Sequence, residues 1–220
     1  MSPIIFIDLE TTGLNPATAA PISIAALVCS GPHHGKLFNA QMRPFTGAEI
    51  QPMALLCNGY KANQILAFAD PVHTLNLFVD WLNMVVPEGD AVLAGGYNYR
   101  FDESFLREWF IRSHEDPAWY GNTFAPDYIE VMKEIKTVWP EWRFRFPNMK
   151  LVTQYEHHFG QPLTAAHNEV ADVYATMHLF LHADKHKPTP RYSHLHHELD
   201  TVYAPRTECP HGLGSEDAGS

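Results

Sequence analysis

Two carboxylates stand two residues apart near the start of the chain, in Asp8-Leu9-Glu10. Residues i and i+2 of a strand project to the same face, so Asp8 and Glu10 can point at one site. At a separation of about 4 Å and an effective dielectric of about 20, the two charges repel by about 4 kcal/mol, which a bound cation would offset. Hard oxygen ligands favour Mg2+ or Mn2+ over zinc. A strand-end Asp and Glu that simply face solvent would give the same pattern.

Three more residues could take part in the same chemistry. Asp102 follows a predicted short strand, where it is either a metal ligand or a helix N-cap. His167 precedes a predicted helix, and Asp172 lies in the second turn of that helix. A histidine with a pKa near its usual value of about 6.5 suits a base that removes a proton from water. For this segment alone, a surface His and Asp is the alternative.

The elements that would position these residues begin with strands. Residues 4–7 form a continuous apolar run, which is typical of a central strand buried on both faces. Two further strands are predicted at 22–28 and 36–42, separated by the turn-like Gly31-Pro32, so the three could form a meander.

Most of the remaining pattern is helical, with one short strand at 91–94. Apolar residues at helical spacing predict helices at 52–57, 72–86, 102–112, 127–138, 150–158 and 168–182. Strands followed by helices indicate an α/β domain over residues 1–184. Residues 185–220 form a C-terminal extension that we expect to be partly disordered, because its end is rich in Gly and Ser.

The overall charge bears on how this protein could bind nucleic acid. The 220 residues include 15 Lys and Arg against 25 Asp and Glu, a formal net charge of -10. That balance argues against capture of nucleic acid by a broad basic surface, although not against an enzyme with local contacts. The cysteines lack C-x-x-C spacing, and neither a signal peptide nor a membrane span is apparent. We therefore expect a cytoplasmic protein that does not bind membranes.

Three motifs together resemble those of the DnaQ-like, or DEDDh, 3'-to-5' exonuclease family. They are Asp8-Leu-Glu10-Thr-Thr-Gly-Leu, Asn98-Tyr-Arg-Phe-Asp102 and His167-x4-Asp172, in the family's order. Within the family the closer likeness is to the exonuclease domain of exonuclease I, an enzyme of single-stranded DNA. It rests on Gly96-Tyr-Asn-Tyr-Arg-Phe-Asp-Glu103 and on Ala166-His-Asn-Glu-Val-Ala-Asp-Val-Tyr-Ala-Thr176. The resemblance implies an α/β, RNase H-like mixed sheet flanked by helices.

The resemblance also implies hydrolysis with two Mg2+ or Mn2+ ions per site. Asp8 would bridge both ions, Glu10 and Asp172 would complete one site, and Asp102 would support the other. Such ions activate the attacking water and stabilise the leaving 3' oxygen. His167 would take the proton of that water.

Substrate contacts follow from the same resemblance. Leu14 and Tyr60 would pack on the terminal base, and such stacking is independent of sequence. Asn98 would orient Asp102 or touch a phosphate. Core or surface roles for Leu14 and Tyr60, and a turn role for Asn98, are the alternatives. The full implied set is Thr12, Gly13, Leu14, Tyr60 and Asn98.

Some features depart from the family. Tyr97 stands where a His is common, and Glu169 and Val173 stand where smaller residues are usual, which alters the groove rather than the catalytic set. The chain also stops before the further domains that follow the nuclease domain of exonuclease I. Long processive runs are therefore not expected from this chain, and a protein partner that supplies processivity is one possible interaction.

Two other groups of residues could bind ligands. His178, His182 and His186 recur on one helix face, but without a nearby cysteine we expect a solvated face rather than a zinc site. Arg143, Arg145 and Lys150 alternate with aromatic residues, and they are either nucleic-acid backbone contacts or a solvated loop.

The leading hypothesis is a metal-dependent exonuclease that acts on single-stranded 3' ends, with DNA favoured, and releases nucleoside 5'-monophosphates. Trimming of RNA or oligoribonucleotide 3' ends is the alternative in the same class, since no residue pattern reads out the 2'-OH. An inactive nucleic-acid or partner-binding module on the same fold is the alternative from a different class.

Overall fold

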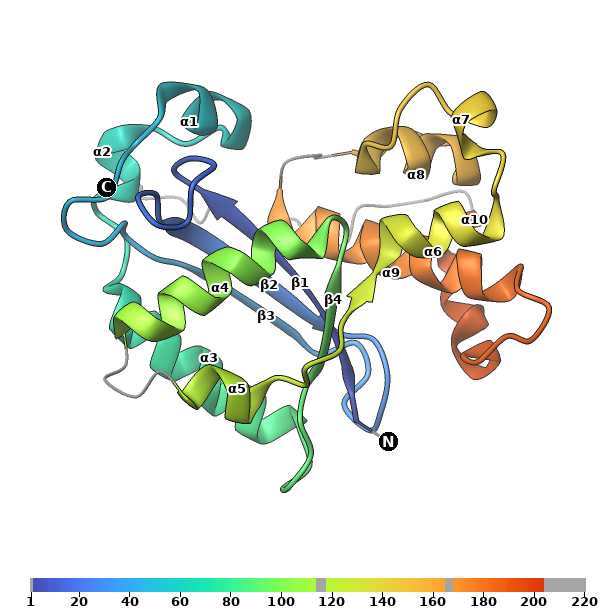
Figure 1. Cartoon of the computed structure of the whole chain (residues 1–220), viewed down its shortest axis with the longest axis horizontal. Helices are drawn as coiled ribbons and strands as arrows, with labels where there is room; N and C mark the ends of the chain where they lie inside the picture. The colour runs from blue at the N-terminus through green and yellow to red at the C-terminus, as the bar shows by residue number, and fades with distance from the viewer. Residues whose placement is uncertain (1, 114–117, 165–167, 204–220) are drawn as a thin grey trace, which may run out of the picture.

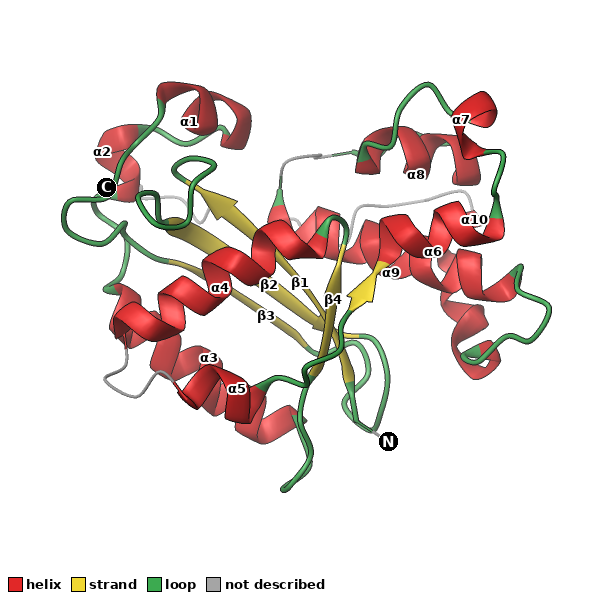
Figure 2. Ribbon diagram, in the orientation of Figure 1, coloured by secondary structure: helices red, strands yellow, loops and turns green. Residues whose placement is uncertain are grey.

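A mixed sheet of five strands, in the order β3-β2-β1-β4-β5, lies at the centre of the structure (Figures 1 and 2). This computed structural model describes residues 2–113, 118–164 and 168–203. The strands are β1 (Ile4–Thr11), β2 (Pro21–Val28), β3 (Leu37–Gln41), β4 (Leu93–Gly96) and β5 (Ile129–Glu130). β1, β2 and β3 pair antiparallel, which confirms the predicted meander, whereas β4 pairs parallel to β1 and β5 parallel to β4.

Helices cover both faces of the sheet (Figure 1). One face packs against α3 (Pro71–Val85), α4 (Tyr99–Ser113) and α5 (Ala118–Thr123). The other packs against α6 (Val131–Val138), α8 (Leu151–Phe159) and α9 (Glu169–Lys185). Two short helices, α1 (Pro52–Asn58) and α2 (Ala62–Ile65), form a smaller apolar cluster with Ile22 of β2.

Strand β1 is buried on both sides, as its continuous apolar run predicts. Ile5 and Ile7 enter the core under α3 and α4, while Ile4 and Phe6 enter the core under α9. Because side chains alternate along a strand, Asp8 and Glu10 continue the row of Ile4 and Phe6 on the α9 face. The strand also extends four residues beyond the predicted run, to Thr11.

The turn between β4 and α4 is shaped by residues that tolerate close approach. A Cβ atom added to Gly95 would lie 2.8 Å from the Cβ atom of Ile129 on β5. Asn98 adopts a left-handed backbone conformation with φ of 63°. Helix α4 therefore begins at Tyr99, three residues before the predicted start at 102, and Asp102 lies inside its first turn. The N-cap role considered for Asp102 is thus wrong.

Several predicted boundaries change in the structure. The segment predicted as one helix over 127–138 opens with strand β5 and only then becomes α6. The prediction also omits the helices α2, α5 and α7 (Trp142–Arg145), which are short. Brief elements of this kind carry too few turns for a periodic pattern to stand out.

The segment after α9 folds back onto that helix. The carboxylate of Asp184, fully buried, accepts hydrogen bonds from the backbone N–H groups of Arg191 and Tyr192 at 3.0 and 2.8 Å, and lies 3.1 Å from His196 Nε2. Leu195 of the 3-10 helix η1 (Ser193–Leu199) joins the core, and α10 (Asp200–Tyr203) follows. The division into a domain at 1–184 and an extension at 185–220 stays a prediction, because 204–220 lie outside the described residues.

The histidines on α9 are less exposed than predicted. His178 and His182 are buried, and only His186 lies at the surface. They pack against aromatic side chains, with Trp139 stacked on His182 at 5.6 Å between ring centroids. The solvated face predicted there is therefore wrong for two of the three. Within the described ranges, every helix is too short or too polar to cross a membrane.

Candidate active site

Three carboxylates meet where the end of β1 passes the start of α9. One oxygen each of Asp8, Glu10 and Asp172 lies within 4.8 Å of the other two. The strand's period of two brings Asp8 and Glu10 together, and packing of α9 on β1 brings Asp172 to them. The structure thus brings together three of the four predicted metal ligands as one acidic cluster.

Asp102 joins this group from the opposite face of the sheet. Its buried carboxylate accepts a hydrogen bond from the backbone N–H of Leu9, the residue between Asp8 and Glu10, at 3.1 Å. Burial, followed by the charge of Asp8, raises the pKa of Asp102 well above its usual value, while the hydrogen bond from Leu9 lowers it. The fourth predicted ligand therefore lies against the same stretch of β1.

The acidic cluster is electrostatically unfavourable by itself. Burial first, then the charges of Asp172 and Glu169, raise the pKa of Asp8 well above its usual value. Burial and the charges of Asp8, Asp172 and Glu169 raise the pKa of Glu10 to about 9. A divalent cation would relieve this repulsion, and an all-oxygen donor set suits Mg2+ or Mn2+. The residues present therefore fit the divalent metal that the sequence predicts.

A fifth carboxylate, Glu169, was not assigned to the site from sequence. Its side chain is buried, and its charge raises the pKa values of Asp8, Glu10 and the Tyr60 phenol. Glu169 opens α9 one turn before Asp172, so the two share a helix face. That i, i+3 spacing was the available signal.

The first turn of α9 suits these acidic residues. The side chain of Asn168 caps the helix by accepting a hydrogen bond from the N–H of Ala171 at 3.2 Å. The positive end of the helix dipole favours carboxylates at this position. His167, the predicted base, lies outside the described residues.

The loop after β1 carries three predicted substrate contacts. Thr12 is fully buried, and its hydroxyl donates to the carbonyl of Glu49 at 2.6 Å and accepts from the N–H of Ala20 at 2.9 Å. The carbonyl of Gly13 accepts from the hydroxyl of Thr11 at 2.8 Å. Leu14, in contrast, is 77% exposed. The hydroxyl of Thr12 is therefore committed to the loop, whereas Leu14 is free to meet a ligand.

Tyr60 stands beside the acidic cluster, after α1. Its hydroxyl accepts a hydrogen bond from Gln41 Nε2 at 2.9 Å, and its ring meets Phe68 edge-on at 5.5 Å between centroids. Burial, then the charge of Glu169, raises the pKa of the phenol. Tyr60 is therefore held from two sides and lies within electrostatic reach of the acidic residues.

Asn98 is exposed at the turn before α4. Its backbone N–H donates to Glu130 Oε1 at 2.8 Å, and it lines an open cavity of about 460 Å3 together with Asp172. That cavity borders the acidic cluster.

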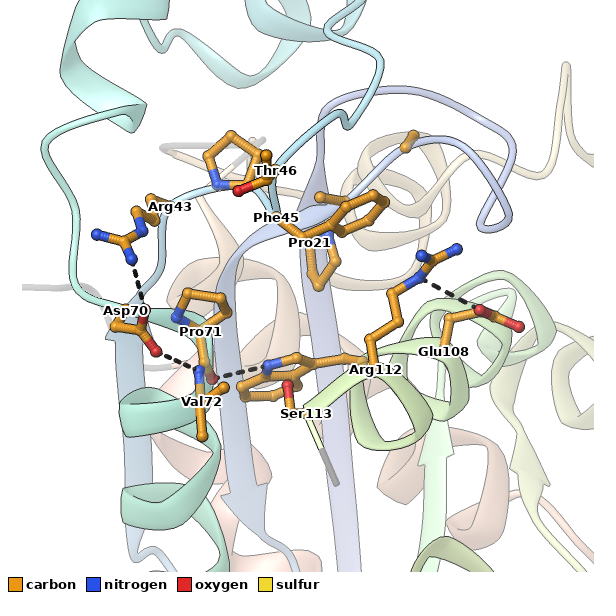
Figure 3. Close-up of a pocket in the computed structure, with 14 residues that line it drawn as sticks. Pro21, Arg43, Phe45, Thr46, Asp70, Pro71, Val72, Glu108, Arg112 and Ser113 are labelled. Carbon is orange, nitrogen blue, oxygen red and sulfur yellow. Dashed lines mark hydrogen bonds and ion pairs between the residues drawn. The ribbon is translucent and has the colours of Figure 1, made fainter. Parts of the chain in front are cut away.

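A second hollow lies elsewhere, between the segment that follows β3, the start of α3 and the end of α4 (Figure 3). Its volume is about 220 Å3, and none of the four predicted metal ligands lines it. Its two arginines are already paired, Arg43 with Asp70 at 2.5 Å and Arg112 with Glu108 at 3.4 Å (Figure 3). We therefore assign no part of the reaction to this hollow.

Comparison with known proteins gives both sequence and structural relatives. No family model matches the chain. The 3'-5' DNA exonuclease Cap18 of Escherichia coli is 31% identical over 105 residues, which cover 47% of this chain and 54% of the relative. Ribonuclease T of Baumannia cicadellinicola subsp. Homalodisca coagulata is 32% identical over 114 residues, which cover 46% of this chain and 50% of the relative. The chain thus spans about half the length of these relatives.

Among solved structures, exonuclease I superposes with a TM-score of 0.67 at 25% identity, over 91% of this chain and 44% of that chain. E. coli exonuclease I in complex with a dT13 oligonucleotide gives a TM-score of 0.64 at 24% identity, over 80% of this chain and 40% of that chain. The predicted RNase H-like fold is therefore confirmed.

Proposed function

We propose that this chain, which resembles the DnaQ-like 3'-5' exonucleases, removes nucleotides from the 3' end of single-stranded nucleic acid, with DNA favoured, and releases nucleoside 5'-monophosphates. The observation that carries this proposal is the acidic cluster of Asp8, Glu10 and Asp172, with Asp102 bound to the same strand. The likeness to the DNA exonuclease Cap18 supports it.

In this proposal the four carboxylates hold two divalent ions. Asp8, Glu10 and Asp172 would hold the metal at the acidic cluster, and Asp102 would support it from α4. When bound, such ions provide Lewis-acid activation of a water and neutralise charge at the leaving 3' oxygen. The protein contributes ligands fixed on β1, α4 and α9, so little reorganisation is needed when the substrate arrives.

The proton of the attacking water needs an acceptor, and we assign that role to an imidazole nitrogen of His167. The sequence places His167 five residues before Asp172. An imidazole with a pKa near its usual value of about 6.5 accepts a proton efficiently at neutral pH.

The terminal nucleotide would lie between the loop after β1 and Tyr60. The exposed Leu14 side chain and the Tyr60 ring would pack against its base, and the backbone at Gly13 would approach it closely. Thr12 would act indirectly, because its hydroxyl fixes the loop. Packing on these faces tolerates every base, as trimming without sequence preference requires.

The test is digestion of a 5'-labelled single-stranded oligonucleotide in Mg2+. The wild-type protein should produce a ladder of shortened 5'-labelled products, and Asp8→Asn should slow their formation at least about 100-fold. The matched control is Asp90→Asn, at an exposed position away from the site. An intact oligonucleotide, or equal ladders from both variants, would contradict the proposal.

RNA is the second candidate substrate, because Ribonuclease T is as similar to this chain as Cap18 is. Parallel digestion of DNA and RNA oligonucleotides of one sequence decides between them. A kcat/KM higher for DNA supports our proposal, and a higher value for RNA replaces it with oligoribonucleotide trimming.

A further inference from the structure

The cavity beside the acidic cluster is lined by Lys150, and the segment just before Lys150 carries further basic and aromatic residues. We infer that this group binds the nucleotides that precede the 3'-terminal one, as the phosphate and base contacts of the incoming strand. We call it the strand-binding surface, and it consists of Trp142, Arg143, Phe144, Arg145 and Lys150. The inference rests on the proposed exonuclease function and extends it to the path of the substrate.

The cavity joins the acidic cluster to this surface. Asp172 and Lys150 both line it, and its volume of about 460 Å3 lies within the range of about 300 to 1,000 Å3 usual for ligand sites. Met149 and Leu151 add apolar lining next to Lys150. A strand cleaved at the acidic cluster would thus leave through a cavity that has a cation and apolar side chains in its walls.

Tyr97 fixes the position of Lys150. Its hydroxyl donates a hydrogen bond to the carbonyl of Met149 at 2.7 Å, which ties the end of β4 to the residue before Lys150. The N–H of Lys150 donates to Asn148 Oδ1 at 2.9 Å, so the backbone is held while the side chain stays exposed. Tyr97 stands where the family commonly has a histidine, and here it acts as a positioning residue.

Helix α7 presents aromatic rings and cations to solvent. Phe144 is 96% exposed, an unusual position for a side chain that gains free energy from burial. The ring of Trp142 has Lys136 Nζ at 4.9 Å and the guanidinium of Arg143 at 5.3 Å from its centroid. Base stacking on aromatic side chains, helped by nearby cations, is the usual means of holding a single strand.

The charge of this segment is opposite to that of the chain. Residues 142–150 contain three of the 15 basic residues and no acidic residue, in a protein with 25 acidic residues. Arg145 is paired with Glu141 at 2.9 Å, while the side chains of Arg143 and Lys150 are exposed. This segment can therefore attract the phosphates of a nucleic acid, although the protein as a whole is acidic.

The experiment compares KM for a 15-nucleotide and a 3-nucleotide DNA strand. The longer strand has twelve further nucleotides with which to contact the strand-binding surface. The test variant is R143A/F144A, and the matched control is K36A/L77A, which removes an exposed lysine and an exposed apolar side chain. Lys36 directly precedes β3, at the end of the sheet where β1 begins, whereas Asp8 and Glu10 lie toward the other end of β1.

We expect R143A/F144A to raise the ratio of the 15-nucleotide KM to the 3-nucleotide KM by about tenfold, as the loss of a stacked base predicts. A ratio equal to that of K36A/L77A would overturn the inference.

Arg143→Glu gives a second test, and it should raise the same ratio while leaving the melting temperature unchanged. Tyr97→Phe should raise KM for both strands with little change in kcat, whereas a loss confined to kcat would exclude its positioning role. If the wild-type protein cleaves neither strand, the proposed exonuclease function fails. If it cleaves both strands but the ratio does not change in R143A/F144A, only the strand-binding inference fails.

Discussion

The backbone N–H of Leu9 donates a hydrogen bond to the carboxylate of Asp102 at 3.1 Å, which joins β1 to the first turn of α4. This contact holds Asp102 against the strand that carries Asp8 and Glu10. Three of the four predicted ligands, Asp8, Glu10 and Asp102, thus depend on one short stretch of backbone.

Replacing Asp102 by Asn should separate stability from activity. The amide oxygen can still accept from Leu9, but the buried charge is gone, so the metal-free protein should melt at a higher temperature. The proposed exonuclease activity should fall at least about 100-fold, because a proposed metal ligand is lost. Melting in EDTA at pH 8 and initial rates in Mg2+ measure the two effects. A variant with full activity would exclude Asp102 as a ligand.

Mg2+ should stabilise the protein more at pH 9 than at pH 7. The pKa of Glu10 is raised to about 9 in the folded state, so the folded protein binds a proton that the unfolded chain releases. Metal-free stability therefore rises as the pH falls from about 9 toward the usual glutamate pKa of about 4.3. Bound metal removes that dependence, and saturating Mg2+ should raise the melting temperature by about 5 °C.

The control for this prediction is a pair of isosteric variants. Glu10→Gln should lose most of the Mg2+ effect, while Glu88→Gln, at an exposed position, should keep it. Equal Mg2+ shifts in both variants would place the ion elsewhere.

Stability should fall as the pH drops below about 6.5, because of the histidines between α8 and α9. Burial, then the charges of His157, Arg145 and His186, lowers the pKa of His158 to about 4. Burial and neighbouring cations lower the pKa of His182 to about 3. The unfolded chain then binds more protons, so stability is lost from about pH 6.5 downward.

Removing one of these histidines should weaken that acid dependence. His158→Phe keeps a ring against Trp139, 4.3 Å away between centroids, and cannot be protonated. His73→Phe, at an exposed position, is the matched control. Urea unfolding at pH 5 and pH 7 should show a smaller difference for His158→Phe alone, and identical differences would show that His158 does not contribute.

Asp184 should be necessary for the segment that follows α9. Its buried carboxylate receives two backbone N–H groups and the ring of His196, so Asp184→Ala leaves those groups without their acceptor. We expect a loss of about 2 to 4 kcal/mol in the free energy of unfolding. Asp90→Ala at the surface should cost less than about 0.5 kcal/mol. A similarly small loss in Asp184→Ala would show that this docking is dispensable.

The sequence predicts best where a periodic pattern is long. The apolar run that begins at Ile4 and the stripe along α9 both identify their elements, and the i, i+2 spacing correctly brings Asp8 and Glu10 to one face. Asp172 lies more than 160 residues further along the chain, and it reaches Asp8 and Glu10 only because α9 packs on β1. Only the family resemblance predicted that Asp172 belongs to the same site.

Other features depend on contacts that no local pattern encodes. The burial of His178 and His182 follows from neighbouring aromatic rings on other helices. Glu169 enters the site because α9 packs on β1, although its own position resembles an ordinary acidic first turn. The early start of α4 follows from the left-handed conformation of Asn98, which Asn adopts more readily than most residues.

The packing of α9 on β1 also bears on synthesis of the protein. The ribosome makes Asp8 more than 160 residues before Asp172. A nascent or prematurely terminated chain that ends before residue 172 lacks part of the acidic cluster. For the function proposed above, the acidic cluster would therefore form only after α9 is made, and shorter copies of the protein would lack the activity.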